Sequence, residues 1–83
     1  MSVESLATVE VARFIASRPS PEQVIAFQPS SEVIERAYAL IDTERSRTLT
    51  EEERRELDSY LTIQHIMILA KAEAHSQLQQ QAS

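Results

Sequence analysis

The stretch TEEERRELDSYLTIQHIMILAKAEAHSQL, residues 50–78, decides the fold of this 83-residue chain. Thr48 and Thr50 each have a glutamate three residues further on, which is the pattern of a helix N-cap. The acidic first turn that follows suits the positive end of a helix dipole. We therefore predict one helix of roughly 29 residues, about 43 Å long at 1.5 Å per residue, that ends near residue 78.

The middle of this predicted helix is apolar on nearly all sides. Two adjacent stripes of large side chains run along residues 60–70, and Ile66 and Leu69 widen the apolar arc beyond what one neighbouring helix covers. A segment of this kind is most simply buried inside a dimer. The predicted interface consists of Tyr60, Ile63, Ile66, Met67, Leu69 and Ala70.

Three prolines, at positions 19, 21 and 29, mark a connector at residues 18–30, because proline biases the residue before it away from helix. Within the connector, Ser20 is placed as an N-cap, Pro21 as the first helical residue and Gln23 as the reciprocal cap. The pattern predicts a short helical turn that presents three apolar side chains to the core: Val24, Ile25 and Phe27.

Two further helices are predicted on either side of the connector. Residues 2–17 place apolar side chains at three- and four-residue spacing, although the alternation within residues 9–16 also permits a strand. A second main helix is expected from a cap at Ser30 or Ser31 to about Glu44. The predicted fold is all-α: a small helical bundle with a helical hairpin and one long C-terminal helix, paired with a second copy. Residues 1–78 form a single domain in this prediction, and residues 79–83 form a flexible tail.

The composition narrows the classes of function. Thirteen acidic and eight basic residues give a formal charge of -5, which repels phosphate backbones and anionic membranes, so neither nucleic acid nor membrane is an expected partner. No cysteine is present, which fits a cytoplasmic protein, and no stretch has the pattern of a signal peptide or a membrane span. The absence of glycine excludes phosphate-binding loops and dinucleotide fingerprints.

Residues 42–53, DTERSRTLTEEE, resemble an EF-hand calcium loop. The ligand positions would be filled by Asp42, Glu44, Ser46, Thr48 and Glu53. The family needs glycine where this chain has Arg47, and Arg45 adds a second positive charge beside the cation. We therefore predict a helical hairpin with poor or absent calcium affinity and no metal site. A weak calcium-responsive helical pair is the alternative function.

No residues are placed for catalysis, so the chain is predicted to be non-enzymatic and to need no cofactor. His65 and His75 are ten residues apart, whereas two imidazoles on one helix share a metal ion at a spacing of four. His65 lies in the most apolar stretch and is interpreted as a partly buried histidine satisfied by a hydrogen bond. No serine has a strand-turn-helix setting with a histidine to activate it.

Three segments carry a resemblance to known proteins: the connector PSPEQVIAFQPSSE, the turn RTLTEEE and the helix ELDSYL. Together they resemble short, uncharacterised bacterial helical proteins of the antitoxin-like or accessory kind, over about two thirds of the chain. The excess apolar surface at residues 60–70 and the negative charge predict an interaction module that forms a homo-oligomer and binds a larger protein through helix faces. A small dimeric regulator is a further alternative, although no predicted face gathers the basic residues that DNA binding needs.

Overall fold

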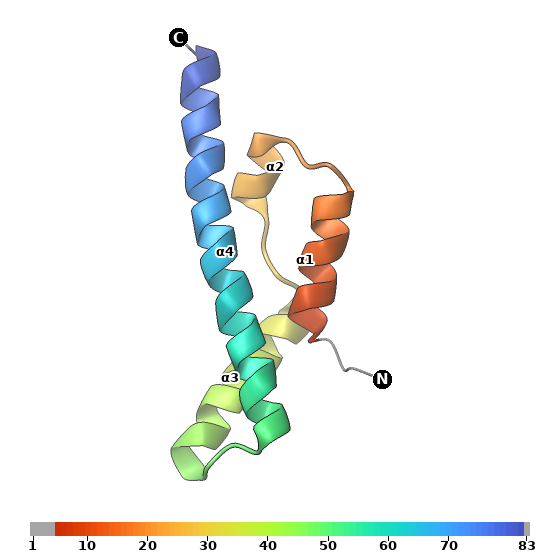
Figure 1. Ribbon diagram of the computed structural model, residues 1–83, viewed down its shortest axis with the longest axis vertical. Coiled ribbons are helices and arrows are strands. Elements are labelled where there is room, and N and C mark those ends of the chain that lie inside the picture. The colour runs from red at the N-terminus through yellow and green to blue at the C-terminus, as the bar shows by residue number, and fades with distance from the viewer. Residues whose placement is uncertain (1–4, 83) are drawn as a thin grey trace.

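The computed structural model describes residues 5–82, and within them the chain forms four helices and no strand: α1 (Leu6–Ala16), α2 (Pro21–Ala26), α3 (Ser31–Ser46) and α4 (Glu51–Ala82). Helix α4 runs along the whole molecule, and each of the other three packs against it (Figure 1). The predicted all-α fold with one long C-terminal helix is confirmed. Helix α3 runs opposite to α4, and α1 runs in roughly the same direction as α4 (Figure 1).

Side-chain caps set where the helices begin. The side chains of Ser5 and Ser30 accept hydrogen bonds from backbone N–H groups of α1 and α3, and Ser20 forms the predicted capping box with Gln23. Of the two predicted caps for the last helix, Thr50 is the one used: its hydroxyl accepts from the N–H of Glu53, whose carboxylate accepts from the N–H of Thr50. Such reciprocal bonds satisfy donors that a helix start otherwise leaves unpaired.

Some boundaries differ from the predicted ones. Residues 9–16 are helical, which excludes the strand alternative, and the predicted start of that helix near residue 2 lies outside the described residues. Helix α3 ends at Ser46 rather than Glu44. Helix α4 continues to Ala82, so residues 79–82, predicted as a tail, belong to it. Glutamine and alanine are good helix formers, and no glycine or proline stops the helix there.

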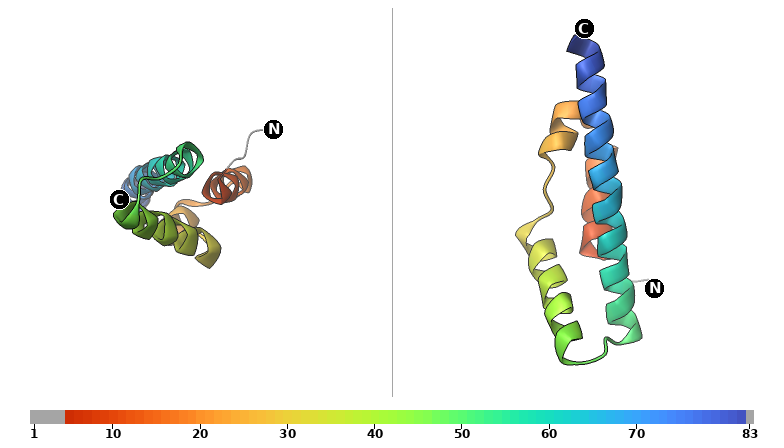
Figure 2. Two further views of the ribbon diagram at one scale, coloured as in Figure 1. Left: turned by 90° about the horizontal axis from the view of Figure 1, so that it is seen from below. Right: turned by 90° about the vertical axis from the view of Figure 1, so that its left-hand side faces the viewer.

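The best-buried cluster lies at the hairpin between α3 and α4. It consists of Leu40, Leu49 and Leu57, with Ile41 packed against it, and Leu40 is only 2% exposed. Leu49 belongs to the connection between the two helices, so the turn itself contributes to the core. Figure 2 shows how α3 and α4 diverge from this hairpin and leave room for α1 between their upper parts.

Helix α1 is joined to α4 by a cluster of three hydroxyl groups. The Oγ atoms of Ser5 and Ser59 are 3.0 Å apart, and the hydroxyl of Thr8 lies 2.9 Å from each of them. At the other end of α1, the rings of Phe14 and Phe27 have centroids 4.5 Å apart. This contact joins the end of α1 to the residue that follows α2. The hydroxyl cluster and the ring pair together position α1 and α2 relative to α4.

The molecule is elongated. Its radius of gyration is 15.2 Å and its extents are 52 × 28 × 18 Å, whereas a compact chain of this length has a radius of gyration of about 12 Å. The C-terminal end of α4 extends beyond α2 (Figure 1). Within residues 5–82, no helix combines the length and the apolar character needed to cross a membrane.

Candidate protein-interaction site

A hollow of the surface, here called the α4 groove, lies between α4, α1, α3 and the connection between α2 and α3. It encloses about 310 Å³. Helix α4 forms its floor with Tyr60, Ile63, Gln64, Met67, Ile68 and Lys71. The facing walls come from α1, α3 and the α2–α3 connection, which contributes Phe27 and Pro29. The volume lies in the range of protein pockets that take up apolar groups.

Two large apolar side chains at the groove are strongly exposed. Tyr38 on α3 is 66% exposed and Ile68 on α4 is 58% exposed, and both line the α4 groove. A scattered exposed leucine or isoleucine needs no explanation, but apolar side chains that gather around a hollow mark binding surfaces. The groove therefore presents an apolar entrance as well as an apolar interior.

Two charged side chains line the groove, and they differ in how they are used. The Glu10 carboxylate accepts a hydrogen bond of 2.9 Å from the backbone N–H of Ser30, so it holds the start of α3. Lys71 is half-buried, and no residue among 5–82 forms a hydrogen bond or ion pair with its ammonium group. An ammonium group without an acceptor at an apolar groove favours a ligand that brings a carboxylate or carbonyl oxygen.

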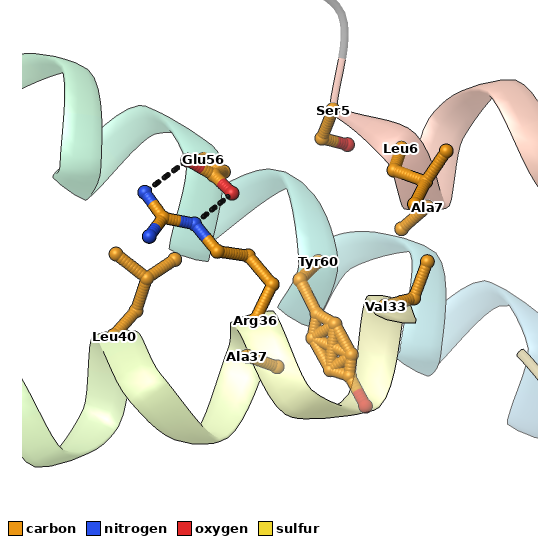
Figure 3. A pocket seen from close by; sticks show the side chains of 9 residues that line it. All are labelled: Ser5, Leu6, Ala7, Val33, Arg36, Ala37, Leu40, Glu56 and Tyr60. Carbon is orange, nitrogen blue, oxygen red and sulfur yellow. Dashed lines mark hydrogen bonds and ion pairs between the residues drawn. The ribbon is translucent and has the colours of Figure 1, made fainter. Parts of the chain in front are cut away.

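Below the groove, α1, α3 and α4 meet around a cavity of only about 20 Å³, shown in Figure 3. The ring of Tyr60 reaches from α4 toward α3, beside Ala37 (Figure 3). At the hairpin side, Arg36 and Glu56 form a two-pronged ion pair with N–O distances of 2.7 and 3.0 Å, and this bonding raises the pKa of Arg36. The Arg36–Glu56 ion pair and the ring of Tyr60 therefore line the small cavity below the α4 groove.

The structure divides the six predicted interface residues between two faces of α4. Met67 is buried, and Tyr60, Ile63 and Ala70 are half-buried on the side that α1–α3 cover. Ile66 and Leu69 are exposed, outside the part of the helix that the other helices cover. The prediction did not include Leu61, Ile68 or Tyr38, which are also exposed. Their spacing along α3 and α4 indicates an apolar arc but does not show which part of that arc a neighbouring helix covers.

The residues that resemble a calcium loop are not brought together. Asp42, Glu44 and Ser46 lie on α3, and Glu53 lies in the first turn of α4. Asp42 and Glu44 are in ion pairs with Arg45 and Arg54. Among residues 5–82 no group of three or more His, Cys, Asp or Glu is placed to hold a metal ion.

The turn also explains why Arg47 can stand where an EF-hand has glycine. Arg47 has φ -160° and ψ 168°, an extended conformation that any residue adopts. Its guanidinium donates to both carboxylate oxygens of Glu53 at 2.9 Å, and also to the carbonyl of Thr48. The bond from Arg47 is the main cause that lowers the pKa of Glu53 from its ordinary value of 4.5 to about 2. The arginine and the glutamate therefore close the hairpin.

Glu53→Gln tests this ion pair, because glutamine keeps the capping function and loses the charge. A carboxylate with a lowered pKa stabilises the folded state above its ordinary pKa, and this contribution is lost as the pH falls from 4.5 to about 2. We expect the variant to have a lower free energy of unfolding than the wild type at pH 7 and an equal one near pH 2, measured by urea denaturation. Glu52→Gln, at an exposed neighbour, is the control and should show no such difference. A Glu53→Gln deficit that stays constant with pH would contradict the assignment.

Both histidines lie on the surface of α4. His65 is exposed, so its interpretation as a partly buried side chain is wrong. His75 is also exposed. The apolar neighbours of His65 in sequence are shared between two faces, which is why the sequence alone suggested burial.

Compared with protein-family models, curated proteins and solved structures, the chain has no significant match in any of the three. The fold and the site define an all-helical chain with an apolar groove across a long helix.

Proposed function

We propose that this chain is a non-enzymatic protein-interaction module, of the antitoxin-like or accessory kind, that receives an amphipathic helix of a larger partner protein in the α4 groove. The observation that carries the proposal is the groove itself: about 310 Å³ between packed helices, with exposed Tyr38 and Ile68 around it. Helices bind in such grooves by inserting apolar side chains spaced three or four residues apart.

The chemistry of the groove specifies the partner further. Its apolar floor fits leucine, isoleucine or phenylalanine side chains, and the unpaired ammonium of Lys71 fits one acidic residue on the same helix. The formal charge of -5 favours a partner whose surface around that helix is basic, because complementary charge accelerates association and disfavours wrong partners. The partner is therefore a basic protein with an apolar helix that carries one acidic residue.

An affinity capture with matched variants tests the proposal. The tagged wild-type chain is used to retain proteins from its native host, in parallel with Tyr38→Asp at the groove and Ile15→Asp on α1. Ile15 is 61% exposed, close to the 66% of Tyr38, and does not line the groove. We expect one protein at near-equal stoichiometry with the wild type and Ile15→Asp, and at least about tenfold less with Tyr38→Asp, equivalent to about 1.4 kcal/mol.

Two results would contradict the proposal: no stoichiometric protein with the wild type, or the same retention by Tyr38→Asp. Lys71→Met adds a test of the charge, because methionine keeps much of the apolar stem and removes the ammonium. We expect it to weaken retention less than Tyr38→Asp does. Retention unchanged by Lys71→Met would remove the acidic residue from the description of the partner.

A further inference from the structure

A second apolar surface lies on the side of α4 that faces away from the groove. Its residues, here called the outer face, are Leu61, Thr62, His65, Ile66, Leu69 and Ala72, and all six are exposed. At 100° per residue they span one continuous arc, on the opposite side of the helix from Tyr60, Ile63 and Met67. Figure 2 shows that the other helices leave one long side of α4 uncovered.

The outer face has the composition of an interface centre. Leu61, Ile66 and Leu69 are 47%, 47% and 57% exposed, and none of the six residues is a lysine, arginine, aspartate or glutamate. The centres of protein interfaces are likewise poor in charged residues and rich in large apolar ones. Charged residues follow beyond both ends of the outer face: Asp58 and Arg55 toward the start of α4 and Glu73 toward its end.

The chain exposes more surface than a compact monomer of its mass, and the excess is close to what one dimer contact buries. The surface measures 6274 Å², whereas a compact monomer of 9.4 kDa exposes about 5,000 Å². The excess is somewhat more than 1,000 Å², and a standard interface buries about 800 Å² on each partner. One contact of ordinary size along α4 would therefore bring the chain to the exposed area usual for its mass.

We propose that the outer face of α4 binds the outer face of a second copy, with the two α4 helices antiparallel about a two-fold axis near His65. This surface is separate from the α4 groove, so the proposal stands independently of the proposed function. In a two-fold contact the same surface of both copies meets, so a single apolar surface in the middle of a long helix is sufficient to form it.

Charge favours the antiparallel direction over the parallel one. Arg55 and Glu73 lie nine residues on either side of position 64, on the same side of the helix. Antiparallel pairing places Arg55 of one copy near Glu73 of the other, whereas parallel pairing places like charges opposite each other. Arg55 is paired with Glu51 within its own chain, but both side chains are at least 75% exposed, so this surface pair leaves the guanidinium accessible. Asp58, the acidic residue nearest the outer face on that side, lies close to Arg54, which offsets its charge.

Mass measurements on single variants test the surface. In light scattering over a dilution series, we expect the wild type to approach twice the 9.4 kDa chain mass at high concentration. Leu69→Asp should remain at the chain mass, because it buries a charge in the contact. Ile15→Asp, similarly exposed on α1, should behave like the wild type. A monomeric wild type at all concentrations, or a dimeric Leu69→Asp, would overturn the proposal.

Variants also separate this proposal from the proposed function. A chain that loses self-association with Tyr38→Asp and keeps it with Leu69→Asp would dimerise through the groove, which would overturn the outer-face assignment. Conversely, if Leu69→Asp is monomeric and still retains the same partner as the wild type, the two surfaces act independently and the outer-face assignment is supported.

Cysteine cross-linking tests the direction without destabilising the contact. The chain has no cysteine, so a single introduced thiol can form a disulfide only with the same position of another copy. Antiparallel pairing near His65 predicts that His65→Cys cross-links under mild oxidation. Gln79→Cys should not, because position 79 lies about 21 Å along α4 from the axis. Cross-linking at both positions would indicate a parallel pair, and cross-linking at neither would remove the outer face from the contact; either result overturns the proposal.

Discussion

Leu40→Ala is expected to lower the free energy of unfolding by about 3 kcal/mol or more, measured by urea denaturation. Leu40 is the best-buried large side chain described, at 2% exposure, and it packs with Leu49 and Leu57 where α3 meets α4. Replacing it with alanine removes apolar area from contact and leaves a cavity that a small hairpin can only partly close. A chain of this length has a total stability of about 4 to 12 kcal/mol, so the variant should lose a large fraction of it.

Leu6→Ala is the control for this prediction, because Leu6 is the same residue type on α1 and is 43% exposed. It should cost less than about 1 kcal/mol. If Leu40→Ala were no more destabilising than Leu6→Ala, the α3–α4 hairpin would not be the main source of stability. Both variants make the same Leu→Ala change, once at a buried and once at an exposed position, so the difference between their free-energy costs reports the effect of burial.

The local signals in the sequence predicted the fold well because they act within a few residues. The Ser20–Gln23 capping box and the Thr50 cap are both formed between residues three positions apart, and both are observed. What the sequence could not show is how far α4 continues. Its last turn, residues 79–82, contains only glutamine and alanine, which neither begin nor stop a helix strongly.

The site was predicted less well because it depends on contacts between distant segments. The sequence places an apolar arc at residues 60–70, but the position of α1–α3 decides which part of the arc becomes the floor of the groove and which stays exposed. His65 illustrates this, since its neighbours are apolar and it is nonetheless exposed. Tyr38 and Ile68 are far apart in the sequence, and only the packing of α3 beside α4 brings both to the same groove.

The resemblance to a calcium loop shows the same limit. The spacing of its acidic residues along the sequence is compatible with a calcium loop and also with a helix. In the structure these residues are helical, because α3 continues to Ser46. Once helical, Asp42 and Glu44 point along the surface and pair with arginines instead of converging with Glu53. The arginine that departs from the family pattern has a structural role of its own, because Arg47 holds the carboxylate that caps α4.

Met67→Ala and Ile66→Ala, at consecutive positions of α4 of which one is buried and the other exposed, are expected to differ by about 1.5 kcal/mol or more at low protein concentration. Met67 is 8% exposed beneath the groove, so its truncation leaves a cavity and should cost about 2 to 4 kcal/mol. Met67→Leu, which conserves volume, should cost less than about 1.5 kcal/mol. Ile66 is 47% exposed, and its truncation should change the free energy of unfolding by no more than about 0.5 kcal/mol in the monomer.

The free-energy costs of these two variants should depend differently on protein concentration, because one side chain is buried within a single chain and the other only in the proposed dimer. Met67 is buried within one chain, so the cost of Met67→Ala should not change as the protein concentration rises. The cost of Ile66→Ala should increase with concentration, because a dimer formed through the outer face buries this side chain and its contribution then enters the measured stability by mass action. A cost of Ile66→Ala that stays small at every concentration would show that the outer face remains exposed, while a large cost in dilute solution would show that the same face is already covered within a single chain.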